Sequence, residues 1–177
     1  MLGGTLQVNL NPNAVAYNLG SDQGGGPNHD IWLQSNLSGN GNLIVNMLTL
    51  LPNTLALYGT NSAYAGSWTN NNGTIEIRSG SVNALGSGSV TMSTASSTFL
   101  SFNTTNDLVI SNSIYGSGQV LKLNTNTVTL YGTDTYTGAT TISNGVLRIG
   151  PSSSITNSSV ISLAAELWMQ ASLADWS

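Results

Sequence analysis

The sequence predicts an all-β fold, a β-solenoid of about seven turns, and three observations predict it. Short stretches alternate apolar and polar residues with a period of two, which is typical of strands that bury one side. Asn-Gly, Gly-Ser and Asn-Thr pairs, which favour tight turns, separate these stretches. A long repeat is superimposed on them. A sandwich has no reason to restate its sequence, whereas a solenoid stacks equivalent turns on one another.

The long repeat has a period of about 70 residues. Leu57–Thr60 returns as Leu130–Thr133, and Asn72–Arg78 returns at nearly the same offset as Asn144–Gly150. The segment Gly4–Val8 is similar to the closing piece of both copies. At roughly 20–25 residues a turn, one repeat is expected to make about three turns and the whole chain about seven.

Five stretches carry the alternating pattern most clearly. They are Thr54–Leu57, Thr74–Ile77, Val120–Leu123, Thr127–Leu130 and Val146–Ile149. We expect Leu, Val and Ile to point inward from these strands and Thr, Asn and Ser to point outward. The stretch 166–169 is also predicted to be a strand, and the last residues to cap the rod or fray.

The aromatic residues are expected to pack or to stack rather than to form a site. Four tyrosines recur with the repeat, and a catalytic residue has no need to recur: they are Tyr58, Tyr64, Tyr131 and Tyr136. Exposed tryptophans could stack on sugar rings. However, Trp32 and Trp168 sit in the apolar stretches Ile31–Leu33 and Leu167–Met169, which favours their burial.

Composition excludes several classes of protein. The 177 residues include 25 Ser, 22 Asn, 20 Thr and 20 Gly, but only 7 acidic and 3 basic residues, for a net charge of −4. Three basic residues cannot neutralise a phosphate backbone, so no nucleic-acid partner is expected. The absence of cysteine excludes disulfides, thiolate zinc sites and a Cys nucleophile. The longest apolar run, Leu48–Leu51, is far shorter than a membrane span, so no membrane insertion is expected.

One glycine-rich segment, Gly24–Asp30, has no counterpart in the repeat and holds the only histidine. A departure from a repeat is a place where function can be grafted. The candidate interaction residues in and beside it are Asp22, Asn28, His29, Asp30 and Trp32. One histidine with one or two aspartates falls short of a metal site, so neither a metal nor a cofactor is expected. A solvated loop is the more ordinary interpretation.

Catalysis is not expected either. The β-helices that cleave polysaccharides need convergent carboxylates. The acids of this chain do not fall at matching positions of the repeat, since Glu76 aligns with Arg148 and Asp134 with Asn61. A β-helix that binds or cleaves glycans through the loop at 22–30 stays open as an alternative.

The second copy of the repeat, residues 114–149, carries a characteristic order of motifs. The order is the turn Gly116–Gly118, a strand containing Lys122, the segment Leu130–Thr141 and the closing piece Gly145–Leu147. It resembles the autotransporter-associated β-strand repeat. The Ala-Leu-Gly-x-Gly turn that often follows the closing strand in that family is present as Ala84–Gly88.

The first copy departs from the family pattern. Ser67-Trp68 stands where the second copy has a Thr-Thr pair, and four extra residues lie near Met47–Leu51. The resemblance nevertheless covers most of residues 37–163. It gives one domain, residues 1–177, with copies at about 1–36 (partial), 37–113 and 114–177 (partial).

The resemblance implies a right-handed, single-stranded parallel β-helix in the passenger of a secreted bacterial protein. Its location would be extracellular or on the outer-membrane surface of a Gram-negative bacterium. Its function would be that of a structural or adhesive rod without enzymatic activity, with surface glycans as one kind of partner.

The beginning of the chain suggests a second kind of partner. Gly4–Val8 starts in mid-repeat without a polar cap, and an uncapped rung exposes backbone groups and apolar surface. We therefore expect either a fragment of a longer rod or association with other copies, end to end or laterally. A self-assembling extracellular filament is the corresponding alternative function.

Overall fold

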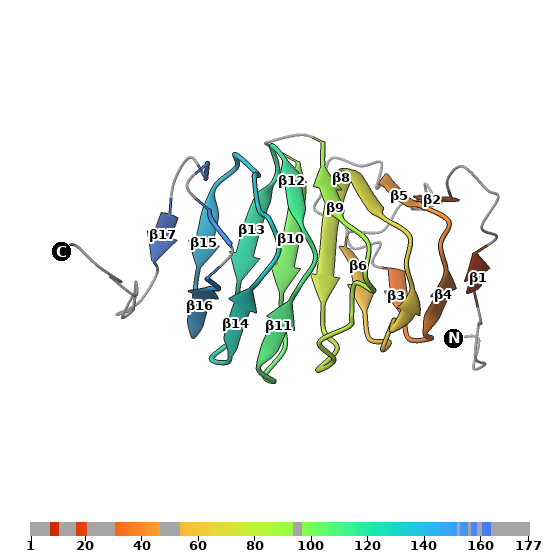
Figure 1. Cartoon of the computed structure of the whole chain (residues 1–177), viewed down its shortest axis with the longest axis horizontal. Coiled ribbons are helices and arrows are strands. Elements are labelled where there is room, and N and C mark those ends of the chain that lie inside the picture. The colour runs from red at the N-terminus through yellow and green to blue at the C-terminus, as the bar shows by residue number, and fades with distance from the viewer. Residues whose placement is uncertain are drawn as a thin grey trace, which may run out of the picture.

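The protein is an elongated β-solenoid, with β1 and β17 at opposite ends (Figure 1). A computed structural model describes residues 8–10, 17–20, 31–46, 54–93, 97–151, 153–155, 157–158 and 161–163. These residues contain strands and turns but no helix, so no membrane-spanning helix is found among them. Every strand pairing is parallel, which confirms the predicted all-β solenoid.

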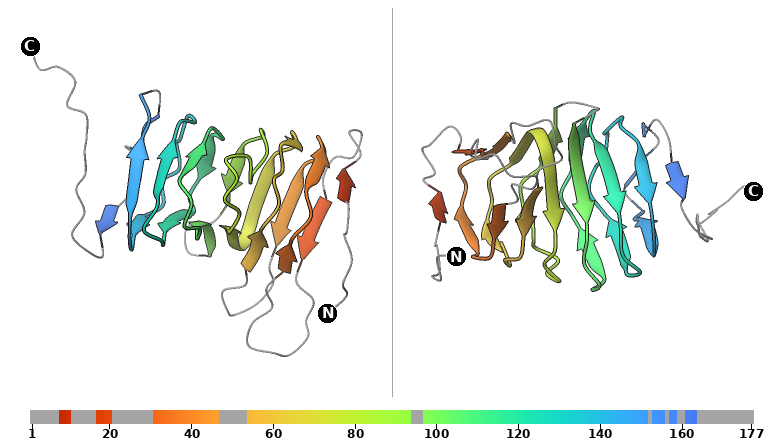
Figure 2. Two further views of the ribbon diagram at one scale, coloured as in Figure 1. Left: turned by 90° about the horizontal axis from the view of Figure 1, so that it is seen from below. Right: turned by 180° about the vertical axis from the view of Figure 1, so that it is seen from behind.

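The strands follow one another around three faces of the rod (Figure 2). The first face holds two separate sheets. One consists of β1 (Val8–Leu10), β4 (Leu37–Gly39) and β7 (Ala63–Tyr64), and the other, further along the chain, of β11 (Leu108–Ile110), β14 (Thr127–Leu130) and β16 (Val146–Ile149). The second face holds β2 (Tyr17–Gly20), β5 (Leu43–Asn46), the first half of β8 (Trp68–Ile77), β9 (Val90–Met92) and β12 (Ile114–Gly116). The third face holds β3 (Ile31–Leu33), β6 (Thr54–Leu57), the second half of β8, β10 (Thr98–Phe102), β13 (Gln119–Lys122), β15 (Thr140–Ile142) and β17 (Ile161–Leu163).

The described residues form about five turns. On the third face, five successive pairings lead from β3 through β6, β8, β10 and β13 to β15. Paired residues along this path lie 20 to 25 positions apart in the sequence, as Leu55 and Ile75 or Ile75 and Leu100 do. The predicted length of a turn is therefore confirmed, whereas the predicted seven turns are not.

The sequence repeat covers about three turns, as predicted, but it does not return to the same face. Thr54–Leu57 lies on the third face between β3 and β8, but its copy Thr127–Leu130 lies on the first face between β11 and β16. Similarly, β5 lies on the second face and its counterpart β13 on the third. One repeat thus covers three turns and one further strand, so each copy is rotated by one face.

The core is built from inward columns that run from turn to turn. On the third face one column reads Leu33, Leu57, Ile77, Phe102, Lys122 and Ile142. Each of these side chains is buried, which confirms the predicted inward direction for the apolar members of this column, whereas Leu121 on β13 is only partly buried. The exception to the apolar pattern is Lys122, whose surroundings are described with the candidate site.

Glycines allow successive turns to approach closely. A Cβ atom at Gly88 would lie 2.0 Å from the carbonyl oxygen of Gly66, and one at Gly66 would lie 2.1 Å from that of Gly41. The second copy repeats the contact, because a Cβ atom at Gly138 would lie 2.0 Å from the carbonyl oxygen of Gly118. Any larger residue would force the stacked backbones apart. This explains why glycine recurs at the equivalent positions 66 and 138.

The recurrent tyrosines divide into two kinds. Tyr64 and Tyr136 are fully buried, which confirms their predicted packing role. Burial raises the pKa of Tyr136 to about 12 despite its hydrogen bond with Thr140. Tyr58 and Tyr131 are instead exposed on the surface, where Tyr58 lies against the ring of Trp32. Each directly follows an inward leucine, and the alternation of the strand turns the next side chain outward.

Candidate functional site

The predicted interaction loop lies mostly outside the described residues. Asp22, Asn28, His29 and Asp30 fall there, so their role stays a prediction. Trp32 is described, on β3.

The predicted burial of Trp32 is wrong. In the three-residue strand β3, Leu33 points into the core, so the preceding side chain points outward and is 55% exposed. The indole lies against Tyr58, with ring centroids 6.1 Å apart and ring planes inclined at 57°. An apolar triplet on a strand that is buried on one side must expose its middle residue. The surrounding hydrophobicity therefore misled the prediction.

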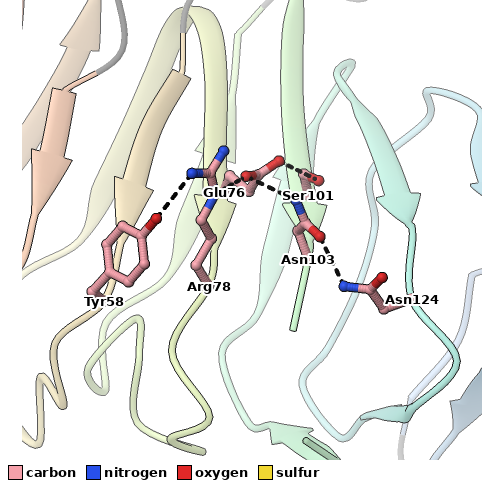
Figure 3. Close-up of polar contacts among 6 residues, drawn as sticks. All are labelled: Tyr58, Glu76, Arg78, Ser101, Asn103 and Asn124. Atoms are coloured by element: carbon pink, nitrogen blue, oxygen red, sulfur yellow. Dashed lines mark hydrogen bonds and ion pairs between the residues drawn. The ribbon is translucent and has the colours of Figure 1, made fainter. Parts of the chain in front are cut away.

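Arg78 extends this aromatic pair along the third face (Figure 3). Its Nη1 donates a hydrogen bond to the Tyr58 hydroxyl at 2.9 Å, and its Nε forms an ion pair with Glu76 Oε1. The guanidinium carbon lies 5.8 Å from the centroid of the Tyr58 ring, within cation–π range. The hydrogen bond to Tyr58 and the nearby carboxylate raise the pKa of Arg78, so the side chain stays cationic.

Glu76 connects the arginine to the following turns. Its Oε2 accepts a hydrogen bond from Ser101 Oγ at 3.3 Å, and its Oε1 accepts one from Asn103 Nδ2 at 3.1 Å. Asn103 Oδ1 in turn accepts a hydrogen bond from Asn124 Nδ2 at 2.8 Å (Figure 3). The carboxylate is thus nearly buried yet paired with a charge and with two neutral donors, as a buried charge needs to be.

We call this row of outward side chains the third-face track. It consists of Trp32, Tyr58, Glu76, Arg78, Ser101, Asn103 and Asn124. Its members lie on, or within two residues after, five successive strands of the third face, β3, β6, β8, β10 and β13. Four steps between paired strands give the track a length of about 20 Å along the rod. Its formal charge is zero, because the single cation and the single carboxylate pair with each other.

Sequence reasoning missed the track, although signals for it existed. Residues two apart on a strand share a face, which placed Glu76 with Arg78, and Ser101 with Asn103, on one side of the sheet. In addition, the second copy has Gly150 where the first has Arg78, so the pair departs from the repeat. The register between strands of successive turns, which brings these pairs together, could not be inferred from the sequence.

A second group of polar residues lies inside the rod, where Asn61 and Asp134 occupy equivalent positions. Asn61 Oδ1 accepts a hydrogen bond from the Leu37 amide at 2.7 Å, and Asp134 Oδ1 accepts one from the Ile114 amide at 3.0 Å. Asn61 Nδ2 also donates to the Ala84 carbonyl oxygen at 2.6 Å. The corresponding Oδ2 of Asp134 is buried and has no partner among the described residues. Burial raises the pKa of Asp134 to about 6.

We expect Asp134→Asn to stabilise the protein at pH 8 by about 2 kcal/mol. Because the folded state raises the pKa of Asp134 above its usual value, folding favours the protonated acid. The wild-type protein therefore loses stability as the pH rises through about 6, while the amide does not titrate. The gain should shrink toward zero near pH 4. Urea unfolding of both proteins from pH 4 to pH 8 measures it.

The reciprocal change, Asn61→Asp, is the matched control for this prediction. It places a carboxylate at the equivalent interior position and removes the bond to Ala84, so it should destabilise the protein increasingly as the pH rises. A gain for Asp134→Asn that is the same at every pH would show that titration of this carboxyl is not its cause.

Lys122 is a buried cation with a structural role. Its Nζ donates to Asn126 Oδ1 at 2.7 Å, to the Asn144 carbonyl oxygen at 3.3 Å and to that of Asn124. Burial lowers the pKa of Lys122, and Asp107 opposes this shift. The ammonium group thus donates hydrogen bonds to oxygens of the connecting loops and links successive turns of the solenoid.

The described carboxylates do not converge. Glu76 lies on the outside of the third face, Asp134 lies inside the rod, and Asp107 Oδ1 accepts a hydrogen bond from the Thr127 amide at 2.7 Å before β14. The described residues contain no group of three His, Cys, Asp or Glu side chains that could bind a metal ion.

Comparison of the chain with protein-family models, with curated proteins and with solved structures finds no match.

Proposed function

We propose that this protein is the structural and adhesive rod of a secreted or cell-surface bacterial protein, similar to an autotransporter passenger. The rod would be a right-handed β-helix without enzymatic activity. The observation that carries the proposal is the parallel stacking of about five turns, whose strand pairing continues without a break along the third face. Each turn buries its apolar columns against the next, which makes a rod stiff along its axis.

The outer surface supports the same function. Neutral side chains bond from one turn to the next, as Ser67 and Ser89 do at 3.1 Å, Asn71 and Ser93 at 2.8 Å, and Asn103 and Asn124 at 2.8 Å. Such rows satisfy polar groups without charge repulsion between turns. A rod of this kind can hold a terminal domain away from the cell or contact a partner through many weak polar interactions.

Surface display tests the proposal. The chain would be joined to a signal peptide, an N-terminal epitope tag and the membrane barrel of an autotransporter, and expressed in a Gram-negative host. We expect protease added to intact cells to remove the tag and to leave the β-rich rod resistant. Cells that carry the tagged barrel alone are the control for display. A tag that stays protected behind the outer membrane while the control is cleaved would contradict the proposal.

Self-association is a second candidate function, favoured by the edge of the first face. Among the described strands, β16 pairs with β14 on one side only. Val146 on β16 is exposed, and Leu147 is only partly buried, whereas its partner Val128 in the preceding turn is fully buried. Sedimentation velocity over a hundredfold range of concentration would reveal a growing assembly, and electron microscopy would show filaments. A monomer at all concentrations would count against this candidate.

A further inference from the structure

We propose that the third-face track binds a neutral, extended polysaccharide laid along the axis of the rod. The inference deepens the adhesive part of the proposed function and rests on it, since it names the ligand class that the rod would hold. Three properties of the track lead to this ligand: its exposed aromatic rings, its fixed hydrogen-bonding groups and its absence of net charge.

The aromatic rings provide the stacking surface. Trp32 and Tyr58 are 55% and 37% exposed and lie side by side at 6.1 Å. Burying an indole is favourable, and Trp68 on β8 is fully buried. Trp32 remains exposed on the surface of the rod, and an exposed large apolar side chain of this kind is typical of a binding surface. The axial C–H groups of a pyranose form an apolar patch of about the area of such a ring, while its hydroxyl groups point sideways. Two adjacent rings of different tilt therefore suit two successive sugar units.

The polar members of the track supply hydrogen bonds from positions that are already fixed. Arg78 uses Nε and Nη1 for Glu76 and Tyr58, and its Nη2 makes no hydrogen bond with the described residues. Asn124 uses its Nδ2 for Asn103, which leaves its Oδ1 as an acceptor. Planar guanidinium and amide groups bond well to neighbouring hydroxyls, which both donate and accept. Because the network holds these side chains in place beforehand, binding costs little side-chain entropy.

Charge selects a neutral ligand. The only cation of the track is paired with Glu76, and the whole chain carries a net charge of −4. A polyanion such as an acidic polysaccharide or a nucleic acid would have to break that ion pair and approach a protein of the same sign. A neutral glycan meets neither obstacle.

The geometry of the solenoid selects an extended chain. The track crosses five successive strands, so its groups recur along the axis at a spacing of about 4.8 Å. In a flat β-1,4-linked chain each pyranose unit advances by a similar distance, which lets successive units meet successive turns. About four units would span the track. A helical α-1,4-linked chain curves away from a straight row of this kind.

Two other exposed tyrosines provide matched controls. Tyr115 on β12 is as exposed as Tyr58, at 37%, and Tyr131 after β14 is 46% exposed. They lie on the second and first faces, and neither contacts another ring among the described residues. If any exposed aromatic ring sufficed, removing these two would weaken binding as much as removing the members of the track.

The test is calorimetric titration of the purified full chain with three neutral or acidic oligosaccharides. Cellohexaose represents the extended neutral chain, maltohexaose the curved one and hexagalacturonate the acidic one. We expect cellohexaose to bind with a Kd below about 1 mM, and the other two at least about tenfold more weakly. Trp32→Ala and Tyr58→Ala should each raise the Kd for cellohexaose about tenfold, and Tyr115→Ala and Tyr131→Ala less than about twofold.

Several outcomes would overturn the proposal. They are no binding of cellohexaose at about 10 mM, equal binding by Trp32→Ala and the wild type, or equal losses in the control variants. Tighter binding of hexagalacturonate would refute the neutral ligand, and equal binding of maltohexaose would refute the extended one. Circular dichroism of each variant checks that the rod is intact. The display experiment is independent of these titrations, so a rod that reaches the cell surface without binding any glycan would refute the track and leave the rod function standing.

Discussion

Replacing Trp68 with alanine is expected to lower the free energy of unfolding by about 4 kcal/mol. Trp68 is the largest of the fully buried side chains. Its Nε1 donates a hydrogen bond to the Leu85 carbonyl oxygen at 2.8 Å, and its ring meets Tyr64 edge to face, with centroids 5.5 Å apart. The substitution leaves a cavity between stacked turns, an unpaired carbonyl oxygen and a tyrosine without its ring partner.

The matched control for this variant is Trp32→Ala, which removes the same side chain from the outside of the third face. Because Trp32 is mostly exposed, we expect it to cost less than about 1 kcal/mol. Urea unfolding monitored by far-UV circular dichroism measures the free energy of unfolding of both variants. The far-UV signal follows the loss of strands and does not depend on tryptophan fluorescence. Equal losses for the two variants would show that the inward and outward directions of these tryptophans are assigned wrongly.

Replacing Gly116 with alanine is expected to lower the free energy of unfolding by about 3 kcal/mol or more. The φ angle of Gly116 is 97°, a left-handed conformation that strains an alanine. An added Cβ would also lie 2.0 Å from the carbonyl oxygen of Met92, with which Gly116 is in register between β12 and β9. Relief would require two paired strands to separate, so thermal unfolding should show a large decrease in Tm.

Gly80→Ala is the control for this variant, because its added Cβ would clash at the same distance with a side chain rather than with the backbone. A Cβ at Gly80 would also lie 2.0 Å from its nearest atom, but that atom is Nδ2 at the end of the exposed Asn106 side chain. The amide can rotate away, so we expect a loss below about 1 kcal/mol. If Gly80→Ala were as damaging as Gly116→Ala, backbone strain would not be the cause of the Gly116 effect.

Much of the local structure was predictable because it depends on neighbouring residues. Thr54–Leu57, Thr74–Ile77, Thr127–Leu130 and Val146–Ile149 are strands as predicted, since a period of two needs only a strand with one buried side. The Asn-Gly pair before Val146 separates two strands as predicted, with a φ angle of 73° at Gly145, whereas Asn72-Gly73 lies inside β8 and only the positive φ of 94° at Gly73 was expected. The burial of Tyr64 and Tyr136 was inferred correctly from their recurrence.

The candidate site was not predictable in the same way. Trp32 was expected inside because its neighbours are apolar, yet the direction of each side chain depends on which neighbour faces the core. Glu76, Arg78 and Asn103 come from two successive turns, and only the register of β8 with β10 brings them into contact. The unpaired oxygen of Asp134 likewise depends on its position inside the rod.

The all-β solenoid, its strands and the length of about 20 to 25 residues for each solenoid turn were predictable from the amino-acid sequence, because they follow from local alternation and from the repeat. Only the tertiary structure shows which strands of successive turns pair, and in which register. The repeat exceeds three turns by one strand, so the copy of β6 is β14, on a different face. Among the described residues the third-face track occurs once. The number of residues in each turn, and not the repeat, determines which side chains of successive turns become neighbours.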